Sequence, residues 1–371
     1  MSEYTEVEQP FLQQLKAQGW NIIDQGQGIP QAPSISLRAN FREWLLPDVF
    51  NQAIRAINKT DTGLPWLTDN QLLDLQTQIL RQPNRTLLEA NEAIQALLFK
   101  AQVNENELTG EQDPIVKLID FSHPENNQFH AINQFRIDTP GCVKQFIIPD
   151  IVLFVNGIPL IVVECKLGGP NCANPMHEAF IQLQRYRNGR ISTLQAGLKE
   201  GETRLFHSNL FVIRSTAVEA DYGTITSGEE HFYAWKTLWP DEDSLANEMN
   251  QQQQLIAGML SQSNLLKVLR TSTVFMDTDS GPRIKVVCRY QQFRAANKIL
   301  QRLRKGNNAT ERSGVVWHTQ GSGKSLTMVF VARLLRSSSD LNDFKIVLVN
   351  DRSDLEEQLS KTAVLIGGYV N

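Results

Sequence analysis

The spacing of apolar residues changes along the chain from helical to strand-like and back again. A helical period predicts a helix over residues 8–19 and mostly helical structure over residues 40–101. From residue 115 the apolar residues fall into short runs that are typical of strands. We therefore expect an α/β domain over residues 1–260, with a mixed central sheet flanked by helices and a helical insertion at about residues 40–110.

The sheet region contains several predicted strands and one helix. The strands are expected at Ile115–Phe121, Gln128–Ile137, Gln145–Val155, Ile158–Lys166 and Leu205–Ile213, and the helix at Glu178–Arg187. Asn156-Gly157 separates two of these strands and is a strong signal for a hairpin turn. The unbroken apolar run over residues 160–163 indicates a central strand that is buried on both faces.

A second α/β pattern begins near Arg283. Its predicted helices are Tyr290–Leu303, Ser325–Leu335 and Asp354–Val364, and its predicted strands are Gly314–Trp317 and Lys345–Asn350. Alternating strands and helices predict a parallel sheet. We place a linker over residues 261–282 and the beginning of this second, incomplete domain over residues 283–371.

Composition narrows the class of protein. The chain has 371 residues, and its 41% hydrophobic and 20% charged residues are typical of a globular protein of about two domains. It contains 36 Lys and Arg against 40 Asp and Glu, so the formal net charge is −4. This balance argues against DNA binding by bulk charge but leaves room for a local basic groove.

Cysteine usage and the apolar runs bear on location. The cysteines are Cys142, Cys165, Cys172 and Cys288, and none form a C-x-x-C pair, which argues against a zinc site. We expect reduced thiols and a cytoplasmic protein. The N-terminus has no signal-peptide profile, and no apolar run approaches the roughly 18 residues of a membrane span. We therefore expect no membrane association.

Two short motifs at strand ends carry a candidate chemistry. Pro149-Asp150 is followed by Glu164-Cys165-Lys166, which matches the PD…(D/E)xK pattern of DNA nucleases. Two carboxylates suit a hard cation such as Mg²⁺, which would polarise a scissile phosphate and lower the pKa of a bound water. Lys166 would orient or deprotonate that water and offset developing charge. Alternatively, Glu164 and Lys166 are only the exposed end of a strand, although three such groups beside a buried strand are costly unless paired or metal-bound.

The hairpin register decides whether the two carboxylates can share a metal. A strict two-residue turn would pair Asp150 with Val163 and would place Asp150 and Glu164 on opposite faces of the sheet. A shift of one residue is required, from a three-residue loop with Gly157 left-handed or from a bulge near Pro149. We predict this shift, with the Cβ atoms of Asp150 and Glu164 roughly 5 Å apart.

Three further side chains are candidates for the same site. Gln182 and Tyr186 are four residues apart on one helix face, where they either reach DNA and hold the metal ligands or form an ordinary polar face. Glu8 either supplies a further metal-binding carboxylate or is a helix N-terminal glutamate favoured by the dipole. We assign no chemistry to His177 and Cys165.

A glycine-rich loop in the second domain is the other candidate site. His318-Thr319-Gln320-Gly321-Ser322-Gly323-Lys324-Ser325 is a Walker A loop in a strand–loop–helix context. Backbone N–H groups of Gly321, Ser322 and Gly323 would cradle the phosphates of ATP. Lys324 would reach the β/γ phosphates and Ser325 would bind Mg²⁺. The strict pattern has glycine where this chain has His318, and the alternative is a chance glycine-rich turn.

Neighbouring segments fit a helicase-type motor. Arg289-Tyr290-x-Gln292 is similar to a Q motif, in which Gln292 would read adenine and Tyr290 would stack, unless it is a plain helix start. The strand before Asp351-Arg352 is either the next helicase motif or an ordinary strand. The sequence up to Asn371 holds no D-E-x-[DH] strand and no arginine finger, so we expect no useful rate of ATP hydrolysis.

A nuclease motif followed by a helicase motif resembles the R (restriction and motor) subunit of type I restriction-modification enzymes. Asn156-Gly157-Ile158-Pro159-Leu160 and the Walker A loop carry this resemblance most specifically. It implies a RecA-like second domain, catalytic roles for Asp150, Glu164 and Lys166, and a family Q-x-x-x-Y motif at Gln182 and Tyr186.

The resemblance also implies partners and a cellular setting. It implies a bacterial or archaeal enzyme that pumps and cuts double-stranded DNA together with modification and specificity subunits. The chain would be the N-terminal part of that subunit. The alternatives are a DNA-repair nuclease–helicase and an assembly module without nuclease activity.

Overall fold

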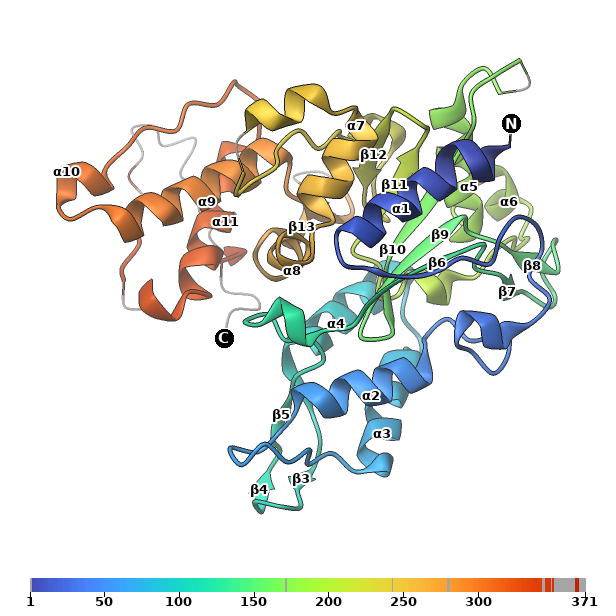
Figure 1. The fold of residues 1–371 in the computed structure, drawn as a ribbon, viewed down its shortest axis with the longest axis horizontal. Helices are drawn as coiled ribbons and strands as arrows, with labels where there is room; N and C mark the ends of the chain where they lie inside the picture. The colour runs from blue at the N-terminus through green and yellow to red at the C-terminus, as the bar shows by residue number, and fades with distance from the viewer. Residues whose placement is uncertain are drawn as a thin grey trace.

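The computed structural model describes residues 2–170, 172–241, 243–278, 281–341, 344–347, 349 and 364–366. A mixed six-stranded sheet forms the centre of the first domain, with strand order β1-β6-β9-β10-β11-β12 (Figure 1). Its strands are β1 (Asn21–Ile23), β6 (Phe129–Asn133), β9 (Ile151–Val155), β10 (Ile158–Cys165), β11 (Phe211–Ser215) and β12 (Ala220–Gly223). The pairs β1–β6 and β10–β11 are parallel and the other neighbours are antiparallel, as predicted for a mixed sheet.

Helices and short strands surround this sheet. The chain begins with the π turn η1 (Tyr4–Glu8) and α1 (Gln9–Ala17). The other elements of the first domain are η2 (Pro33–Ser36), η3 (Pro124–Asn126), β7 (Ile137–Asp138), β8 (Phe146–Ile147), α5 (Pro175–Tyr186), α6 (Ile191–Gln195), η4 (Thr203–Phe206), η5 (Glu229–His231), η6 (Asp243–Glu248), α7 (Gln251–Gln254) and η7 (Leu255–Met259). Every residue of β9 and β10 is buried, which confirms the prediction of a central strand covered on both faces.

A helical insertion lies between β1 and β6, as predicted. It contains α2 (Pro47–Ile57), α3 (Asp69–Leu80), α4 (Leu87–Lys100), β2 (Ala101–Gln102), β3 (Glu105–Asn106), β4 (Glu111–Gln112) and β5 (Ile115–Val116). Helices α3 and α4 each begin with a capping box, in which Thr68 pairs with Gln71 and Thr86 with Glu89. Figure 1 shows α2, α3 and the β3–β4 hairpin below the sheet.

Four of the predicted strands are shorter than expected or interrupted. The strand predicted at residues 128–137 is extended only in β6 and at the start of β7, and the strand predicted at residues 145–155 is divided into β8 and β9. Only Ile115–Val116 of the predicted strand at residues 115–121 is extended, and it pairs with β2 in the insertion rather than with the main sheet. The segment before Phe211 forms the 3-10 turn η4, so β11 begins several residues later than predicted.

The turn at Asn156-Gly157 has two residues, and the register shift occurs elsewhere. Asn156 and Gly157 both have positive φ, 50° and 77°, as a two-residue turn of this hand requires. Val155 pairs with Ile158, but the ladder then slips by one residue between Pro159 and Ile161. Leu160 is therefore the extra residue of a β-bulge.

The bulge gives the register that a shared metal needs. Beyond it Ile151 pairs with Val163, so the next residues, Asp150 and Glu164, lie opposite each other. The predicted shift is confirmed, although neither a three-residue loop nor a bulge at Pro149 produces it. Pro159 has no N–H to give to the ladder, which makes this part of β10 a favourable place for a bulge.

The predicted linker and the predicted parallel sheet of the second domain differ from the structure. Residues 261–282 contain α8 (Gln262–Thr271) and β13 (Thr273–Asp277), and β13 pairs antiparallel with β14 (Arg283–Val287). Leu265, Leu266 and Val274 are buried in the common core, so this stretch is not an open linker.

The helices of the second domain agree with the prediction better than its strands. They are α9 (Tyr290–Lys305), α10 (Ala309–Arg312), α11 (Lys324–Arg336) and η8 (Ser339–Leu341). Residues 314–317 are not in a strand, and Val315 and Trp317 are 94% and 83% exposed. Residues 345–347 and 349 are likewise outside strands, whereas Asp351, Arg352 and the predicted helix before residue 364 lie outside the described residues. A strand requires a neighbour, and the described part of this domain offers residues 314–317 none.

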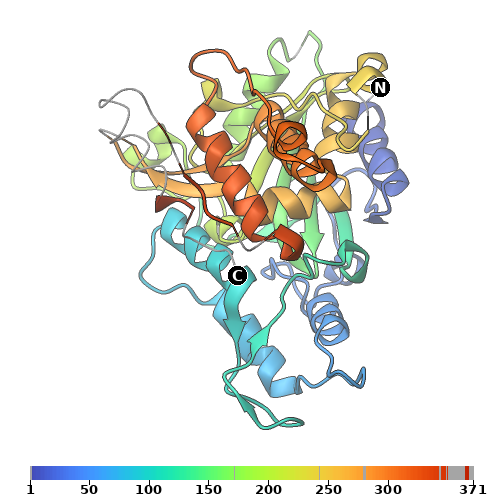
Figure 2. The ribbon, with the colours of Figure 1, turned by 90° about the vertical axis from the view of Figure 1, so that its left-hand side faces the viewer.

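Helices α9 and α11 pack side by side beside the sheet domain. Figure 1 places α9, α10 and α11 at the left, and Figure 2 shows these orange and red helices in front of the green strands. Phe293 of α9 lies 5.2 Å, centroid to centroid, from the ring of Trp235 in the first domain. Among the helices that the structure describes, none is long and apolar enough to cross a bilayer.

The hairpin turn yields a stability prediction. A Cβ atom at Gly157 would lie 2.6 Å from the carbonyl oxygen of Leu46 and 2.8 Å from the nitrogen of Phe50, and its φ is +77°. We expect Gly157→Ala to lower the free energy of unfolding in urea by roughly 2–5 kcal/mol, from left-handed strain and overpacking together.

Gly141→Ala is the matched control. Gly141 has a φ of +84° but nothing within 4 Å of a built Cβ, so only the strain of about 1 kcal/mol is expected. Equal losses for the two variants would show that the contact with α2 does not constrain the turn.

Candidate active site

Two carboxylates meet where β9 begins and β10 ends. Asp150 and Glu164 are 7% and 1% exposed. The backbone N–H of Cys165 donates a hydrogen bond of 2.8 Å to Oδ2 of Asp150, which fixes that carboxylate against the neighbouring strand. The structure thus brings together the two acidic residues that the sequence selected.

Lys166 supplies the positive charge beside them. Its Nζ lies 2.7 Å from Oε1 of Glu164 and 3.7 Å from Oδ2 of Asp150, and it donates to the carbonyl of Cys165 at 2.8 Å. The backbone N–H of Lys166 continues the ladder by donating to the carbonyl of Ser215. The lysine therefore lies on the same side of the sheet as both carboxylates, as the period of two predicted.

The electrostatic balance of this group is strongly perturbed. Burial, and then the charge of Glu164, raise the pKa of Asp150 well above its usual range. Burial also raises the pKa of Glu164, against the opposing effect of Lys166. Burial lowers the pKa of Lys166, but the carboxylates around it outweigh burial and raise that pKa above its ordinary value. The site holds more acidic groups than one lysine can neutralise.

Glu8 joins the group from the N-terminal turn. It is 2% exposed, and both of its oxygens accept hydrogen bonds of 3.0 Å from the side-chain amide of Gln134. Burial, and then the charge of Asp150, raise the pKa of Glu8 to about 7. Oxygens of Glu3, Glu8 and Asp150 all lie within 4.8 Å of one another.

A π turn explains how two N-terminal carboxylates reach one place. In an α-helix, residues three or four apart share a face and residues five apart do not. The turn η1 has i→i+5 bonding, with the N–H of Gln9 bound to the carbonyl of Tyr4, and so places Glu3 near Glu8. An α-helical period gave no signal for Glu3, which the sequence analysis missed.

Gln134 is a second residue that the sequence analysis missed as part of the site. Its φ is +46°, and its backbone N–H donates a hydrogen bond of 2.8 Å to the carbonyl of Asp150. Its side chain binds Glu8, so one residue ties both acidic groups together. A left-handed residue at the end of a strand follows neither the strand period nor the helical period, so the spacing of residues did not select Gln134.

Gln182 and Tyr186 face the site from α5. Nε2 of Gln182 donates to the hydroxyl of Tyr186 at 3.0 Å, and that hydroxyl donates to the carbonyl of Ile148 at 2.8 Å. Tyr186 is 1% exposed, so it does not belong to an ordinary polar surface. The pair holds the segment that leads into Asp150.

The donor set fits a hard divalent cation. All candidate ligands are carboxylate oxygens, which Mg²⁺ prefers. Oε2 of Glu164 is buried without a hydrogen-bond partner, and such an orphaned acceptor is costly unless a cation or water satisfies it. The excess of acidic groups over basic groups at this place points in the same direction.

The segment predicted as a Walker A loop, at residues 318–325, contains a lysine whose side chain folds back onto the loop. Gly321 and Gly323 have φ values of 74° and 76°, and α11 begins at Lys324 and continues with Ser325. Nζ of Lys324 donates to the carbonyls of His318 and Thr319 at 3.0 and 3.3 Å. The ammonium of Lys324 is thus bonded to carbonyls of its own loop, where the sequence predicts that it would contact phosphates.

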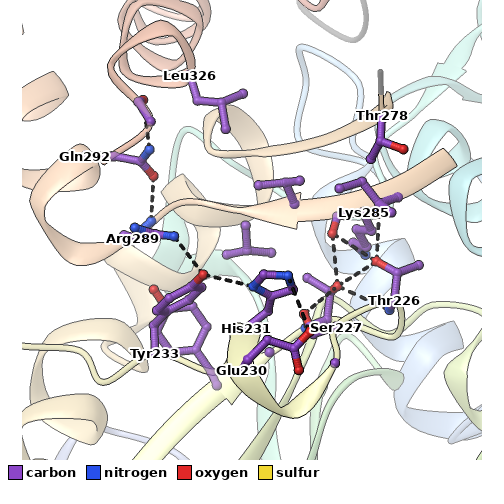
Figure 3. Close-up of a pocket in the computed structure, with 18 of the residues that line it drawn as sticks. Thr226, Ser227, Glu230, His231, Tyr233, Thr278, Lys285, Arg289, Gln292 and Leu326 are labelled. Carbon is purple, nitrogen blue, oxygen red and sulfur yellow. Dashed lines mark hydrogen bonds and ion pairs between the residues drawn. The ribbon is translucent and has the colours of Figure 1, made fainter. Parts of the chain in front are cut away.

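A cavity of about 440 Å³ separates this loop from the sheet domain. One wall includes Thr226, Glu230, His231 and Tyr233 of the first domain (Figure 3). Other parts of the wall are formed by Arg289, Gln292 and Leu326 with the loop residues Gly321, Ser322 and Gly323. Lys324 and Ser325 are not among the lining residues.

Gln292 and Arg289 hold this loop in place. Nε2 of Gln292 donates to the carbonyls of Ser322 and Gly323 at 3.2 and 3.0 Å, and its oxygen accepts from the N–H of Arg289. The Arg289 guanidinium lies 4.1 Å from the ring centre of Tyr233 and donates to its hydroxyl at 2.7 Å. Tyr233 is thus among the aromatic residues that line the cavity, and Tyr290 is not.

An ion-pair network connects the cavity wall with α5. Arg214, the register partner of Glu164 on β11, pairs with Asp221 at 2.6 Å and with Glu229 at 2.7 Å. The other oxygen of Glu229 lies 2.7 Å from Nδ1 of His177 at the start of α5. The loop that contributes Glu230 and His231 to the cavity is therefore anchored to the sheet and to the helix of Tyr186.

Two families match successive parts of the chain. Residues 1–231 match the family described as Type I restriction enzyme R protein N terminus, and residues 291–369 match SWI2/SNF2 ATPase. The first match includes every residue of the candidate site, which comprises Glu3, Glu8, Asp150, Glu164, Lys166, Gln182 and Tyr186.

Several curated relatives are similar over most of the chain. The type I restriction enzyme HindI endonuclease subunit of Haemophilus influenzae is 30% identical over 98% of this chain and 33% of its own length. A putative type I restriction enzyme MjaIXP endonuclease subunit of Methanocaldococcus jannaschii is 27% identical over 95% of this chain and 33% of its own length. The chain spans about a third of the length of these relatives. Because the R-protein match covers more than half of the chain, this protein belongs to the type I restriction enzyme R protein family, in its N-terminal part.

Proposed function

We propose that this chain carries a divalent-metal-dependent nuclease site that cleaves phosphodiester bonds of double-stranded DNA. One observation supports it above the others. The bulge at Leu160 sets Asp150 opposite Glu164, and Lys166 lies within 4 Å of both carboxylates. A regular hairpin would separate the two acids, and a purely structural strand end has no need for this costly arrangement.

Asp150, Glu164 and Glu8 are the proposed metal ligands. Their carboxylate oxygens suit Mg²⁺, which when bound would activate water and offset charge on the phosphate. Glu8 would then exchange its bonds to Gln134 in part for the cation. Burial raises the pKa values of Asp150, Glu8 and Glu164, and a bound cation would favour their charged forms.

Lys166 is the proposed partner of the attacking water and the phosphate. Its ammonium can donate to a phosphate oxygen and so stabilise charge that develops during cleavage. Tyr186 and Gln182 act on the segment before Asp150 and keep that carboxylate in register with Glu164.

The loop at residues 318–325 is the proposed phosphate site for ATP. Backbone groups of Gly321, Ser322 and Gly323 would bind phosphates together with Lys324, and Ser325 would bind Mg²⁺. The adjoining cavity would take the rest of the nucleotide, beside Arg289 and Tyr233. The side-chain nitrogen of Gln292 already donates to the loop, and its oxygen already accepts from Arg289. Gln292 would have to break these hydrogen bonds in order to bind a base.

The names of the relatives extend this proposal to the whole enzyme. They are endonuclease subunits of type I restriction enzymes. We therefore infer a cytoplasmic restriction enzyme, with modification and specificity subunits as partners and ATP-driven movement along DNA in the longer protein.

Removing either charged partner should abolish cleavage. We expect Asp150→Asn and Lys166→Ala to reduce Mg²⁺-dependent cleavage of duplex DNA at least about 100-fold, in the assembled enzyme as in any activity of this chain. Asn is neutral, and the raised pKa of Asp150 shows that burial disfavours its charge, so the melting temperature should not fall sharply.

Asp61→Asn, at an exposed aspartate of the insertion, is the control and should cut normally. Cleavage by Asp150→Asn or Lys166→Ala at the rate of this control would remove the nuclease assignment.

Nucleotide binding has its own prediction. We expect Lys324→Ala to weaken binding of a fluorescent ATP analogue at least about 10-fold, because the ammonium would contact the β/γ phosphates. Lys305→Ala at the exposed end of α9 removes the same charge and should bind as the unaltered protein does. Equal affinity for the two variants would argue against a phosphate site at this loop.

A further inference from the structure

Glu3 contacts the chain at two points just after the end of β10. Its Oε1 lies 3.4 Å from Nζ of Lys166, and its Oε2 accepts a hydrogen bond of 3.1 Å from the backbone N–H of Leu167. The second contact anchors the carboxylate to the chain next to Lys166. The π turn that begins after Glu3 is what brings it there.

Lys166 has competing partners in this arrangement. Its shortest ion pair, at 2.7 Å, is with Glu164, and the pair with Asp150 is 3.7 Å long. A divalent cation bound by Asp150 and Glu164 would repel the ammonium and take over those oxygens. To stay in place, the lysine would then need a nearby anion that does not ligate the metal.

Glu3 meets that need. Because its Oε2 is bound to a backbone N–H, the carboxylate is fixed at the edge of the acidic group, and its Oε1 faces the lysine. Its side chain is 33% exposed, whereas that of Glu164 is 1% exposed, so Glu3 lies nearer to solvent than this proposed metal ligand.

We propose that Glu3 is a positioning residue for the nuclease reaction, which holds Lys166 beside the scissile phosphate when the cation binds Asp150 and Glu164. This inference rests on the proposed nuclease function. It assigns separate tasks to the two acids of the π turn, with Glu8 directed to the metal and Glu3 to the lysine.

The competing role for Glu3 is that of a metal ligand. One of its oxygens lies within 4.8 Å of oxygens of Glu8 and Asp150. The two roles differ in what the loss of Glu3 does to cation binding, and this difference gives the test its first readout.

The test compares Glu3→Gln with Glu6→Gln and Glu8→Gln, all in the same turn. Cation binding is measured by calorimetry with Ca²⁺ alone, and cleavage of duplex DNA is measured with Mg²⁺. For Glu3→Gln we expect Ca²⁺ affinity within about twofold of normal but a fall in kcat of about 10-fold, as is typical for loss of a supporting hydrogen bond at a metal site. Glu8→Gln should weaken Ca²⁺ binding, and Glu6→Gln, which lacks both contacts, should change neither.

A crystal structure of the unaltered protein with Ca²⁺ gives a second readout that needs no variant to fold. We expect Nζ of Lys166 within hydrogen-bond distance of Glu3 and no longer paired with Glu164. A lysine that stays on Glu164, or that leaves Glu3, would overturn the inference.

Two results with the variants would also overturn it. They are equal kcat for Glu3→Gln and Glu6→Gln, and a loss of Ca²⁺ affinity in Glu3→Gln that matches Glu8→Gln. Asp150→Asn and Lys166→Ala in the same series separate the two hypotheses. If these two cut normally, the nuclease function itself fails, and if only Glu3→Gln cuts normally, the positioning role alone fails.

Discussion

The burial of two carboxylates side by side on the central strands is the constraint to which the rest of this structure responds. A buried charge without a partner costs several kcal/mol, and two like charges in contact cost more. Asp150 receives the N–H of Cys165, and Glu164 receives the ammonium of Lys166. The N-terminal turn, Gln134 and α5 each add a contact at this point. The sheet domain is arranged so that segments distant in sequence converge on one edge of β9 and β10.

The spacing of residues along single strands was enough to predict part of the site. The alternation of a strand places Lys166 on the face of Glu164, and the requirement for a shared face predicted a one-residue shift between the hairpin turn and the pair Asp150 and Glu164. The position of the bulge was not predictable, because a loop insertion or a bulge at either strand restores the same parity. Glu3 and Gln134 were missed because a π turn and a left-handed residue break the regular periods on which such analysis depends.

The second domain shows the same division between local and distant causes. Helices α9 and α11 follow from their own amphipathic periods, and the structure has them within about a residue or two of the prediction. The stretch at residues 314–317 has the composition of a strand but no neighbour among the described residues to pair with. The predicted linker is instead part of the core, and Arg214 and Glu229 connect the cavity wall to the strand beside Glu164. The first and second domains are therefore connected by buried, packed residues and not by an open linker.

The extra residue in β10 has a consequence for how loss of activity would appear among related sequences. Deleting one residue between Pro159 and Val163 would restore a regular ladder and turn Glu164 to the far side of the sheet. The strand would keep its hydrophobic character, and both acidic motifs would still be present letter for letter. Under the proposed nuclease function, such a relative would be inactive although both of its motifs are intact. Counting residues from the hairpin turn to the glutamate would reveal the defect that residue identity conceals.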